Sequence, residues 1–313
     1  MTVPSEASVE VDPHAAAVHA VLHCNLNSLD AAGAAAFWEQ LAFTRRMRNQ
    51  SDDTDARFLG LGEHTASDTW FMYDVRGPRA APAIEICEWT DPPVEPRTPG
   101  EAARAVGFTG LGVRVASLGE ETGDSAYVSE QPRHAAWVRG RLRQAQHVAA
   151  PDGVTVEVVE IDPPAGDPED QGAAFSHARL RCTDLEASVA WYERLGWRVV
   201  EPSEPRVDGV SLVVDEDPTF SLELEVDPDA VPSTMQANTQ GVFRIALGCE
   251  DVPGAVQLLR AAGVEAPDAV FTAMPDVPTG GFSVAVLRDP DGTMVELVSR
   301  PRAEVRRPME PAG

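Results

Sequence analysis

The sequence predicts an α+β fold built from four tandem βαβββ modules, and an internal repeat is the main reason. The strand-like segment 19–25 returns as 177–183, and a helix-like stretch of similar composition follows each copy. Self-similarity of this kind indicates that one supersecondary unit is used more than once. The repeat also places a histidine at the start of both copies, His19 in the first and His177 in the second.

Alternating apolar residues divide the chain into four segments, each of which begins with a strand of period two. These strands are expected at 18–25, 108–116, 176–183 and 242–250. Amphipathic helices are expected in the first, third and fourth segments, at 31–43, 185–196 and 252–263. The polar stretch 118–131 of the second segment carries no convincing helix. Each segment ends in a strand with one glutamate in a similar setting, namely Glu85, Glu157, Glu223 and Glu296.

Proline-rich and acidic stretches mark the expected boundaries. Such stretches occur at 92–107, 163–172 and 227–241. Together with the repeat they predict a disordered N-terminus at 1–17, an N-terminal domain at 18–162 with a degenerate second module, a linker at 163–172, a C-terminal domain at 173–300 and a disordered tail at 301–313.

The charge of the chain excludes several classes of partner. Its net charge is −25, and all 25 basic residues are arginine. An acidic surface of this kind disfavours binding to nucleic acid and to anionic membranes, and the lack of lysine excludes Schiff-base chemistry. The expected partner is therefore a small-molecule substrate or ligand, and a homodimer is left open.

The cysteines and the N-terminus predict where the protein is found. The four cysteines lie in apolar runs without Cys-x-x-Cys spacing, which is typical of buried free thiols in a reducing compartment. The first 13 residues lack the pattern of a signal peptide, so a cytoplasmic protein is expected. The bias towards Ala, Arg, Asp and Val suggests that the gene comes from a GC-rich genome, which favours a role in specialised metabolism.

Two motifs resemble the vicinal oxygen chelate superfamily, which includes glyoxalases, extradiol dioxygenases and bleomycin-resistance proteins. The motifs are the strand and helix start at 176–185 and the turn and last strand at 287–297. The resemblance implies that modules pair into two cupped sheets, with the functional site on the concave face. It favours the C-terminal domain as the one that carries the site, and it fits many different reactions because one fold hosts many chemistries.

The resemblance also implies which residues form the site, because metal ligands in this family come from the first and last strands of paired modules. In the C-terminal domain these positions hold His177, Glu223, Arg244 and Glu296. In the N-terminal domain they hold His19, Glu85 and Glu157, with Gly110 in the fourth position, which indicates a weaker second site.

Strand parity adds two candidate substrate-binding residues to the C-terminal site. Arg179 and Arg181 lie on the same strand face as His177, since side chains alternate between the two faces of a strand. By the same rule His23 shares a face with His19 and could replace it.

Arg244 decides the expectation about metal. Arginine stays protonated and is not a metal ligand, and a guanidinium about 5 Å from a dication costs about 7 kcal/mol at an effective dielectric constant of about 20. The sequence therefore favours a site without a cofactor. The alternative is a divalent metal held by His177, Glu223 and Glu296. A third reading is an inactive site closed by a salt bridge to Arg244.

The leading functional hypothesis is an enzyme that moves a proton next to a carbonyl of a small oxygen-rich molecule, as a lyase or isomerase does. Glu296 or Glu223 is the expected general base and His177 its partner, while Arg244 stabilises the oxyanion. The alternatives are a resistance-type protein that sequesters a drug-like molecule, and a metal-dependent enzyme of glyoxalase or epimerase type. Ring cleavage is not expected, because residues 279–288 hold neither the histidine nor the tyrosine of the extradiol enzymes.

Overall fold

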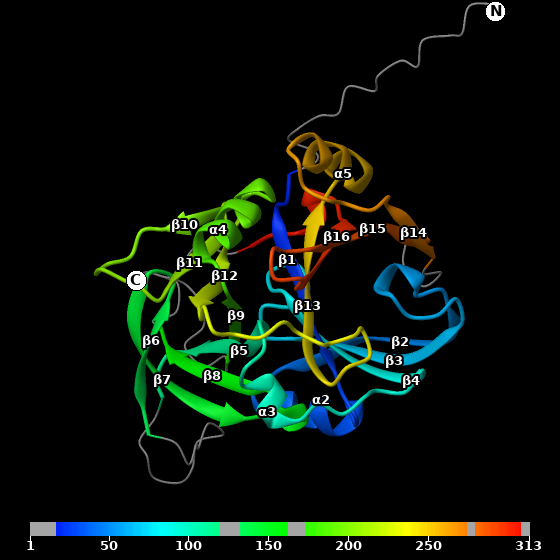
Figure 1. The fold of residues 1–313 in the computed structure, drawn as a ribbon. Helices are drawn as coiled ribbons and strands as arrows, with labels where there is room; N and C mark the ends of the chain where they lie inside the picture. Colours follow the sequence, from blue (N-terminus) through cyan, green and yellow to red (C-terminus); the bar gives the residue numbers. More distant parts are fainter. Residues whose placement is uncertain (1–16, 119–131, 162–172, 274–278, 308–313) are drawn as a thin grey trace, which may run out of the picture.

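The computed structural model describes residues 17–118, 132–161, 173–273 and 279–307, which form two eight-stranded sheets with helices outside them (Figure 1). The predicted α+β class is confirmed. The predicted N-terminal segment up to residue 16, the polar stretch 119–131, the linker at 163–172 and the tail from residue 308 lie outside the described residues.

The four modules follow the order predicted from the sequence. Module 1 consists of β1 (Ala20–Asn27), α2 (Ala31–Gln40), β2 (Thr44–Thr54), β3 (Thr65–Tyr73) and β4 (Ala83–Asp91). Module 2 follows the short helix α3 (Pro99–Ala102) and consists of β5 (Gly107–Val115), β6 (His134–Val138), β7 (Arg141–Ala149) and β8 (Thr155–Glu160). Module 3 consists of β9 (Ala174–Cys182), α4 (Leu185–Arg194), β10 (Trp197–Val200), β11 (Gly209–Val214) and β12 (Asp217–Val226). Module 4 consists of β13 (Gly241–Cys249), α5 (Val252–Ala261), β14 (Val270–Ala273), β15 (Gly281–Arg288) and β16 (Met294–Ser299).

An aspartate starts each of the three longer helices. Asp30, Asp184 and Asp251 are the residues before α2, α4 and α5, and each side chain accepts a hydrogen bond from the backbone N–H three residues later. This satisfies one of the N–H groups that a helix start leaves unpaired. Each of these aspartates therefore fixes the point where the first strand of a module ends and the helix begins.

The pairing of the modules differs from the prediction. One sheet has the order β14-β15-β16-β13-β1-β4-β3-β2 and the other the order β10-β11-β12-β9-β5-β8-β7-β6. Module 1 thus pairs with module 4, and module 2 pairs with module 3, whereas the sequence analysis paired neighbours in the chain. We name the concave faces the β1/β13 cup and the β5/β9 cup after the antiparallel strands at their centres.

The two stretches that connect modules of different sheets explain how this arrangement closes. The chain crosses from one sheet to the other at 92–106 and again at 227–240, and these two segments lie side by side. The backbone N–H of Glu95 donates to the carbonyl of Asn238 at 2.8 Å, and that of Val231 donates to the carbonyl of Arg104 at 2.9 Å. These backbone hydrogen bonds therefore hold the two crossing segments together.

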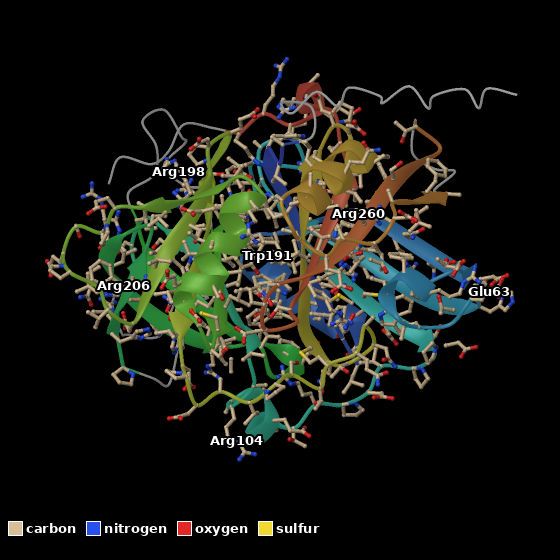
Figure 2. All side chains as sticks on the ribbon, turned by 45° about the horizontal axis from the view of Figure 1, so that its top comes forward. Glu63, Arg104, Trp191, Arg198, Arg206 and Arg260 are labelled. Atoms are coloured by element: carbon tan, nitrogen blue, oxygen red, sulfur yellow. The ribbon has the colours of Figure 1, made fainter. Side chains whose placement is uncertain are left out.

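One hydrophobic core unites both sheets with the helices. It includes the buried residues Trp38 of α2, Leu111 of β5, Tyr192 of α4, Ile245 of β13 and Val256 of α5. Figure 2 shows Trp191 of α4 within the molecule, while Arg198 and Arg260 extend at the surface. The four cysteines are buried free thiols, as predicted. Within the described residues, no helix combines the length and apolar character that crossing a membrane requires.

The prediction of a disordered tail is wrong for residues 301–307. This segment contains a short 3-10 turn and is held by ion pairs. Arg302 Nε lies 3.0 Å from a carboxylate oxygen of Glu216, and Arg307 Nε lies 2.9 Å from Asp217. Both acidic partners belong to the turn and strand around β12, so the tail ties the end of module 4 to module 3. The proline that suggested a tail leads into this turn instead.

Candidate functional site

The four residues predicted as one C-terminal site lie in two different cups. Arg244 of β13 and Glu296 of β16 belong to the β1/β13 cup. His177 of β9 and Glu223 of β12 belong to the sheet of the β5/β9 cup. The predicted quartet is therefore wrong as a group, because each cup draws its residues from modules that are not neighbours in the chain. The weaker predicted set is divided in the same way, with Glu85 on β4 and Glu157 on β8.

A cluster of four charged or titratable side chains forms the floor of the β1/β13 cup. Arg244 donates from Nε to Glu296 Oε2 at 2.8 Å and from Nη2 to Glu85 Oε2 at 2.9 Å. His23 Nε2 lies 3.3 Å from Glu85 Oε2 and 3.6 Å from Glu296 Oε2. Both carboxylates and the guanidinium are buried. The first and last strands of two modules thus meet here, as the resemblance implied, with one histidine different from the prediction.

That histidine is His23, and His19 is elsewhere. His19 precedes β1, and its Nε2 is bonded to the backbone carbonyl oxygen of Arg300 at 2.8 Å. Burial lowers the pKa of His19 more than this bond raises it. His23 lines the cavity of the cup, whereas His19 does not. The prediction of His19 as a site residue is therefore wrong.

Strand register and the helix caps both identify His23 as the equivalent of His177. His23 lies opposite Ala246 of β13, and His177 lies opposite Gly112 of β5, at matching points of the two antiparallel pairs. Seven residues separate His23 from the capping Asp30, as they separate His177 from its own cap. The repeat in the sequence had aligned His19 with His177 on local similarity alone.

The charges of the cluster fix the protonation state of Glu296. Burial by itself raises the pKa of Glu296, but the charge of Arg244 and the hydrogen bond and charge of His23 outweigh it and lower the pKa to about 2. Burial lowers the pKa of Arg244, yet the charges of Glu85 and Glu296 raise it above its usual value. Burial raises the pKa of the neighbouring Cys87 thiol to about 12. At neutral pH Glu296 is therefore ionised, Arg244 is charged and Cys87 is a neutral thiol.

A cavity of about 220 Å³ lies above this cluster. Its polar floor is formed by the cluster, and its walls are mostly apolar and aromatic, with Leu22, Phe58, Phe71, Trp89 and Phe282 among them. Arg244 Nη1 is buried and has no hydrogen-bond partner among the described residues. The cavity therefore offers a charged donor at the bottom of an apolar pocket, which is an arrangement typical of small-molecule sites.

The donor set of the β1/β13 cup does not fit a divalent metal ion. The superfamily resemblance implies a metal at these strand positions, and His23, Glu85 and Glu296 are suitable ligand types. However, Arg244 donates to an oxygen of each carboxylate. A guanidinium has no lone pair to give, and its positive charge repels a cation. Arg244 thus takes the interactions that a metal would need.

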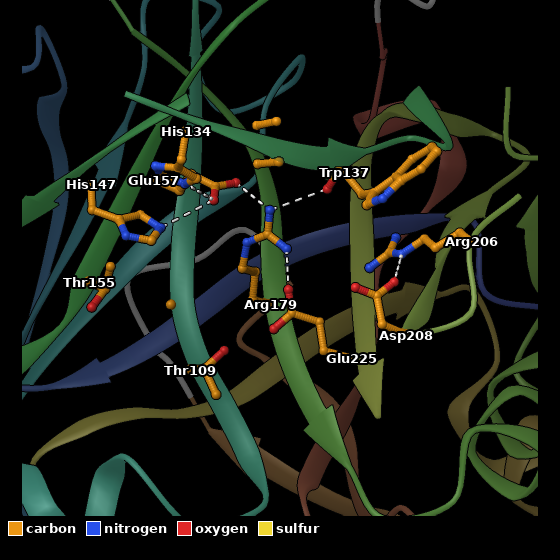
Figure 3. A pocket seen from close by; sticks show the side chains of 13 residues that line it. Thr109, His134, Trp137, His147, Thr155, Glu157, Arg179, Arg206, Asp208 and Glu225 are labelled. Carbon is orange, nitrogen blue, oxygen red and sulfur yellow. Dashed lines mark hydrogen bonds and ion pairs between the residues drawn. The ribbon is translucent and has the colours of Figure 1, made fainter. Parts of the chain in front are cut away.

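The β5/β9 cup is organised around the carboxylate of Glu157 (Figure 3). Its Oε2 accepts from Arg179 Nη2 at 2.5 Å and lies 3.0 Å from His177 Nε2. Its Oε1 lies 3.3 Å from His147 Nε2 and 3.5 Å from His134 Nε2. Burial alone raises the pKa of Glu157, but the hydrogen bonds from His147 and His177 and the charge of Arg179 hold it well below its usual range.

Gly112 allows His177 to reach Glu157. The two side chains are on β9 and β8, and β5 lies between these strands with Gly112 in register with both. A Cβ atom at Gly112 would lie 1.9–2.2 Å from three atoms of the His177 ring. Ser176 Oγ lies 2.7 Å from Nδ1 and fixes the other side of the ring. The imidazole therefore occupies the space where any other residue would place its side chain.

Two other predicted site residues form hydrogen bonds within the protein and do not line this cavity. Glu223 is completely buried, and its carboxylate accepts hydrogen bonds from Ser211 Oγ at 2.6 Å, from Ser221 Oγ at 2.8 Å and from the backbone N–H of Arg139 at 2.9 Å. Arg181 Nη1 donates to the backbone carbonyl of Ala103 at 2.7 Å. Glu223 as a general base and Arg181 as a substrate-binding residue are therefore wrong.

Arg179 does line a cavity, as predicted, together with two histidines that the sequence analysis had not assigned. The cavity of the β5/β9 cup has a volume of about 350 Å³, and Arg179, His134, His147 and Glu157 are among its lining residues. The hairpin of β7 and β8 turns at Asp152, and counting outward from this turn places His147 opposite Glu157. The sequence alone could have given this pairing, because residues at equal distances from a hairpin turn lie opposite one another once the position of the turn is known.

Comparisons with known proteins show which family model and which solved structures the chain is similar to. Residues 174–297 match the family model described as Glyoxalase/Bleomycin resistance protein/Dioxygenase superfamily. Glyoxalase I from Zea mays has a similar structure, with a TM-score of 0.61 and 17% sequence identity over 91% of this chain and 92% of that chain. A candidate dioxygenase from Bacillus subtilis matches with a TM-score of 0.60 and 14% identity over 91% of this chain and 86% of that chain. A comparison with curated protein sequences gave no match.

The resemblance to the vicinal oxygen chelate superfamily is confirmed by these findings. The sequence match covers the third and fourth modules, and the similarity to solved structures extends the fold to nearly the whole chain. At these levels of identity the solved structures establish the fold alone. The reaction has to be argued from the side chains of the two cups.

Proposed function

We propose that the protein is an enzyme whose β1/β13 cup moves a proton next to the carbonyl group of a small, partly apolar molecule without a metal ion. Arg244 Nη1 carries this proposal, because it is a buried charged donor without a partner among the described residues and Arg244 lines the cavity. An unsatisfied buried donor costs about 1–3 kcal/mol or more when charged. A carbonyl or carboxylate oxygen of a ligand would remove that cost.

In this proposal Arg244 and His23 have separate roles. The neutral form of His23 accepts the proton from the carbon next to the carbonyl; the electron pair of the broken C–H bond forms a C=C bond, and the π pair of the C=O bond moves onto the carbonyl oxygen. Arg244 Nη1 stabilises the resulting oxyanion, as fixed cationic donors do. For a 2-hydroxy carbonyl compound this gives an enediolate: the proton of the 2-hydroxyl passes to the oxyanion, and His23 returns its proton to the former carbonyl carbon, so that the C=O bond is re-formed at the neighbouring position and the isomerisation is complete. Glu85, 3.3 Å from His23 Nε2, stabilises the imidazolium in between.

His23 replaces Glu296 as the general base expected from the sequence. A base is most effective when its pKa lies near the working pH, and the pKa of Glu296 is about 2. The bond from Arg244 Nε at 2.8 Å supports a positioning role for Glu296. Specialised metabolism, the cytoplasm and a homodimer stay predictions from the sequence.

Hydrogen exchange tests the proposal without knowledge of the natural substrate. Untagged, EDTA-treated protein is incubated in D₂O with a panel of small 2-hydroxy and 2-oxo carbonyl compounds, and ¹H NMR follows the proton next to each carbonyl. We expect at least one compound to exchange more than 100-fold faster with wild type than with His23→Gln or Arg244→Met. His64→Gln changes an exposed histidine and serves as the control. Equal rates in wild type and both cup variants would refute the proposal.

The second candidate function is sequestration of a small molecule without turnover. The aromatic walls of the β1/β13 cavity favour it, since Phe58, Phe71, Trp89 and Phe282 would bind an apolar ligand equally well without chemistry. The same NMR samples separate the two functions. Ligand signals that broaden in wild type but not in Arg244→Met, with no exchange of the proton, would support sequestration and exclude proton transfer for those compounds.

A further inference from the structure

Two histidines and one glutamate in the β5/β9 cup come together outside the strand positions that the family resemblance implies. They are His134 of β6, His147 of β7 and Glu157 of β8, and one ligand atom from each lies within 4.8 Å of the other two. The resemblance instead implied first-strand and last-strand residues, so Glu157 alone is common to the two sets. The Arg244 cluster of the other cup has no part in this group.

The spacing of these atoms matches the coordination shell of a transition metal. Ligands about 2.0–2.1 Å from a tetrahedral ion lie about 3.3–3.4 Å from one another. Glu157 Oε1 lies 3.3 Å from His147 Nε2 and 3.5 Å from His134 Nε2. The two imidazole rings are tilted by 54° with their centres 4.2 Å apart, so they do not stack flat against one another. Small side-chain shifts would bring all three atoms onto one ion.

The backbone holds the three residues in place. His147 and Glu157 are directly opposite one another in the antiparallel pair of β7 and β8. His134 lies opposite Ala145 in the pair of β6 and β7, so it is diagonal to His147 on the same face of the sheet. Ligands on three adjacent strands have little freedom to move apart, which lowers the cost of forming the site.

The carboxylate of Glu157 is oriented by residues that would not touch the ion. Arg179 and His177 both contact Oε2, at 2.5 Å and 3.0 Å. Oε1 is left facing the two histidines, as Figure 3 shows. Partners of this kind, which fix a ligand through its second oxygen, are a regular feature of metal sites and commonly change affinity by 10–100-fold when removed.

The cavity gives an ion both access and a suitable charge. The side chains of His134 and His147 are 33% and 34% exposed, and both line the cavity of about 350 Å³. The lining also includes three carboxylates and two guanidinium groups, from Glu157, Asp208, Glu225, Arg179 and Arg206. With neutral imidazoles the lining has a net charge of −1, which favours a cation.

We infer that His134 Nε2, His147 Nε2 and Glu157 Oε1 form a binding site for a divalent transition-metal ion of the zinc type. Two imidazoles and one carboxylate are a donor set that zinc binds in proteins, with a fourth position left for water or a ligand oxygen. That position faces the cavity, which Arg179 and Arg206 also line. The second cup thus has a site of its own, independent of proton transfer in the first.

Titration calorimetry with Zn²⁺ alone tests this site. Untagged, EDTA-stripped full-length protein is expected to bind one equivalent of Zn²⁺, and His134→Ala and His147→Ala are each expected to weaken binding at least tenfold. His64→Ala removes an exposed histidine just before β3 of the other sheet and should leave binding unchanged. His23→Ala, in the β1/β13 cup, should leave it unchanged as well.

Two further measurements keep the inference falsifiable. Circular dichroism establishes whether each variant is folded, and His147→Gln, which keeps a polar side chain of similar length, is expected to lose Zn²⁺ if the alanine variants do not fold. Co²⁺ added to wild type should give the visible absorption of a four-coordinate ion. The inference is overturned if wild type takes up no Zn²⁺, or if the His134→Ala/His147→Ala double variant binds it as tightly as wild type.

Discussion

Replacing Arg244 by methionine removes the guanidinium charge that lies between two buried carboxylates. In the wild type the guanidinium lies 2.8 Å and 2.9 Å from oxygens of Glu296 and Glu85, and all three side chains are at most 11% exposed. Breaking a buried ion pair by removing one partner costs about 3–5 kcal/mol, because it leaves an uncompensated buried charge. We therefore expect Arg244→Met to lower the free energy of unfolding at pH 7.5 by about 3–5 kcal/mol.

The pH dependence of this loss identifies its cause. Without Arg244, Glu296 and Glu85 are two buried carboxylates with no guanidinium between them. Burial and their mutual repulsion are then expected to raise the pKa of Glu296 above the ordinary value, against the hydrogen bond and charge of His23. The folded variant then binds a proton more tightly than the unfolded chain does, so it gains stability as the pH falls from about 7.5 to 5.5. The wild type stays ionised at Glu296 throughout this range, and the difference between the two proteins should shrink by about 1 kcal/mol or more.

Urea unfolding at both pH values measures this effect. Arg260→Met is the matched control, because Arg260 is an exposed arginine paired with Asp268 at 2.9 Å. Exposed ion pairs contribute about 0–1 kcal/mol, so the control should differ little from wild type at either pH. A loss below about 1 kcal/mol in Arg244→Met, or an equal loss at both pH values, would contradict the buried-cluster explanation.

Three further predictions concern acid stability, the glycine of β5 and the arginine of the β1/β13 cup. Because the folded pKa of Glu296 is about 2 and the ordinary value is 4.5, the wild type should lose about 3 kcal/mol as the pH falls from about 5 to 2, and urea unfolding of Glu296→Gln should show a smaller loss. Gly112→Ala should lower stability by about 1–3 kcal/mol and the melting temperature with it, since its Cβ would lie about 2 Å from the His177 ring; unchanged melting would count against that contact. Arg244→His replaces the guanidinium by a metal ligand, so calorimetry should detect a second equivalent of Zn²⁺, and a stoichiometry equal to wild type would show that Arg244 is not what excludes a metal.

The modules could be predicted from the sequence because their signals are local. Period-two apolar strands, amphipathic helices and the aspartates before them, such as Asp184, each depend on a few neighbouring residues. The four glutamates of the last strands also fall at equivalent positions, since Glu157 and Glu223 are each in register with a residue of the adjacent first strand. Local signals therefore predicted the fold class and the glutamates that lie in the two cups, Glu85 and Glu296 in one and Glu157 in the other.

The pairing of modules could not be predicted in the same way. The central strands β1, β5, β9 and β13 are all largely buried, and any of them could pair with any other on composition alone. The choice depends on contacts distant in sequence, such as those between the two crossing segments at 92–106 and 227–240. This one error divided the predicted site between two cups.

The remaining errors in the site come from partners that the sequence does not reveal. The carboxylate of Glu223 accepts a hydrogen bond from the backbone N–H of Arg139, a residue of the turn between β6 and β7. Arg181 is directed to the backbone carbonyl of Ala103 in the first crossing segment. His19 and His23 have the same parity in the sequence, but the register of β1 shifts between Val21 and His23, so parity does not place them on one face. The seven-residue distance to the helix cap at Asp30 identifies His23 instead.

Anomalous X-ray scattering from a crystal of the Zn²⁺-treated protein tests the difference between the two cups most directly. We expect one zinc peak, next to His134, His147 and Glu157, and no peak between Glu85 and Glu296, where Arg244 donates to both carboxylates. A peak between Glu85 and Glu296 would contradict the metal-free assignment of the β1/β13 cup. A crystal with no peak beside the two histidines would contradict the metal site of the β5/β9 cup.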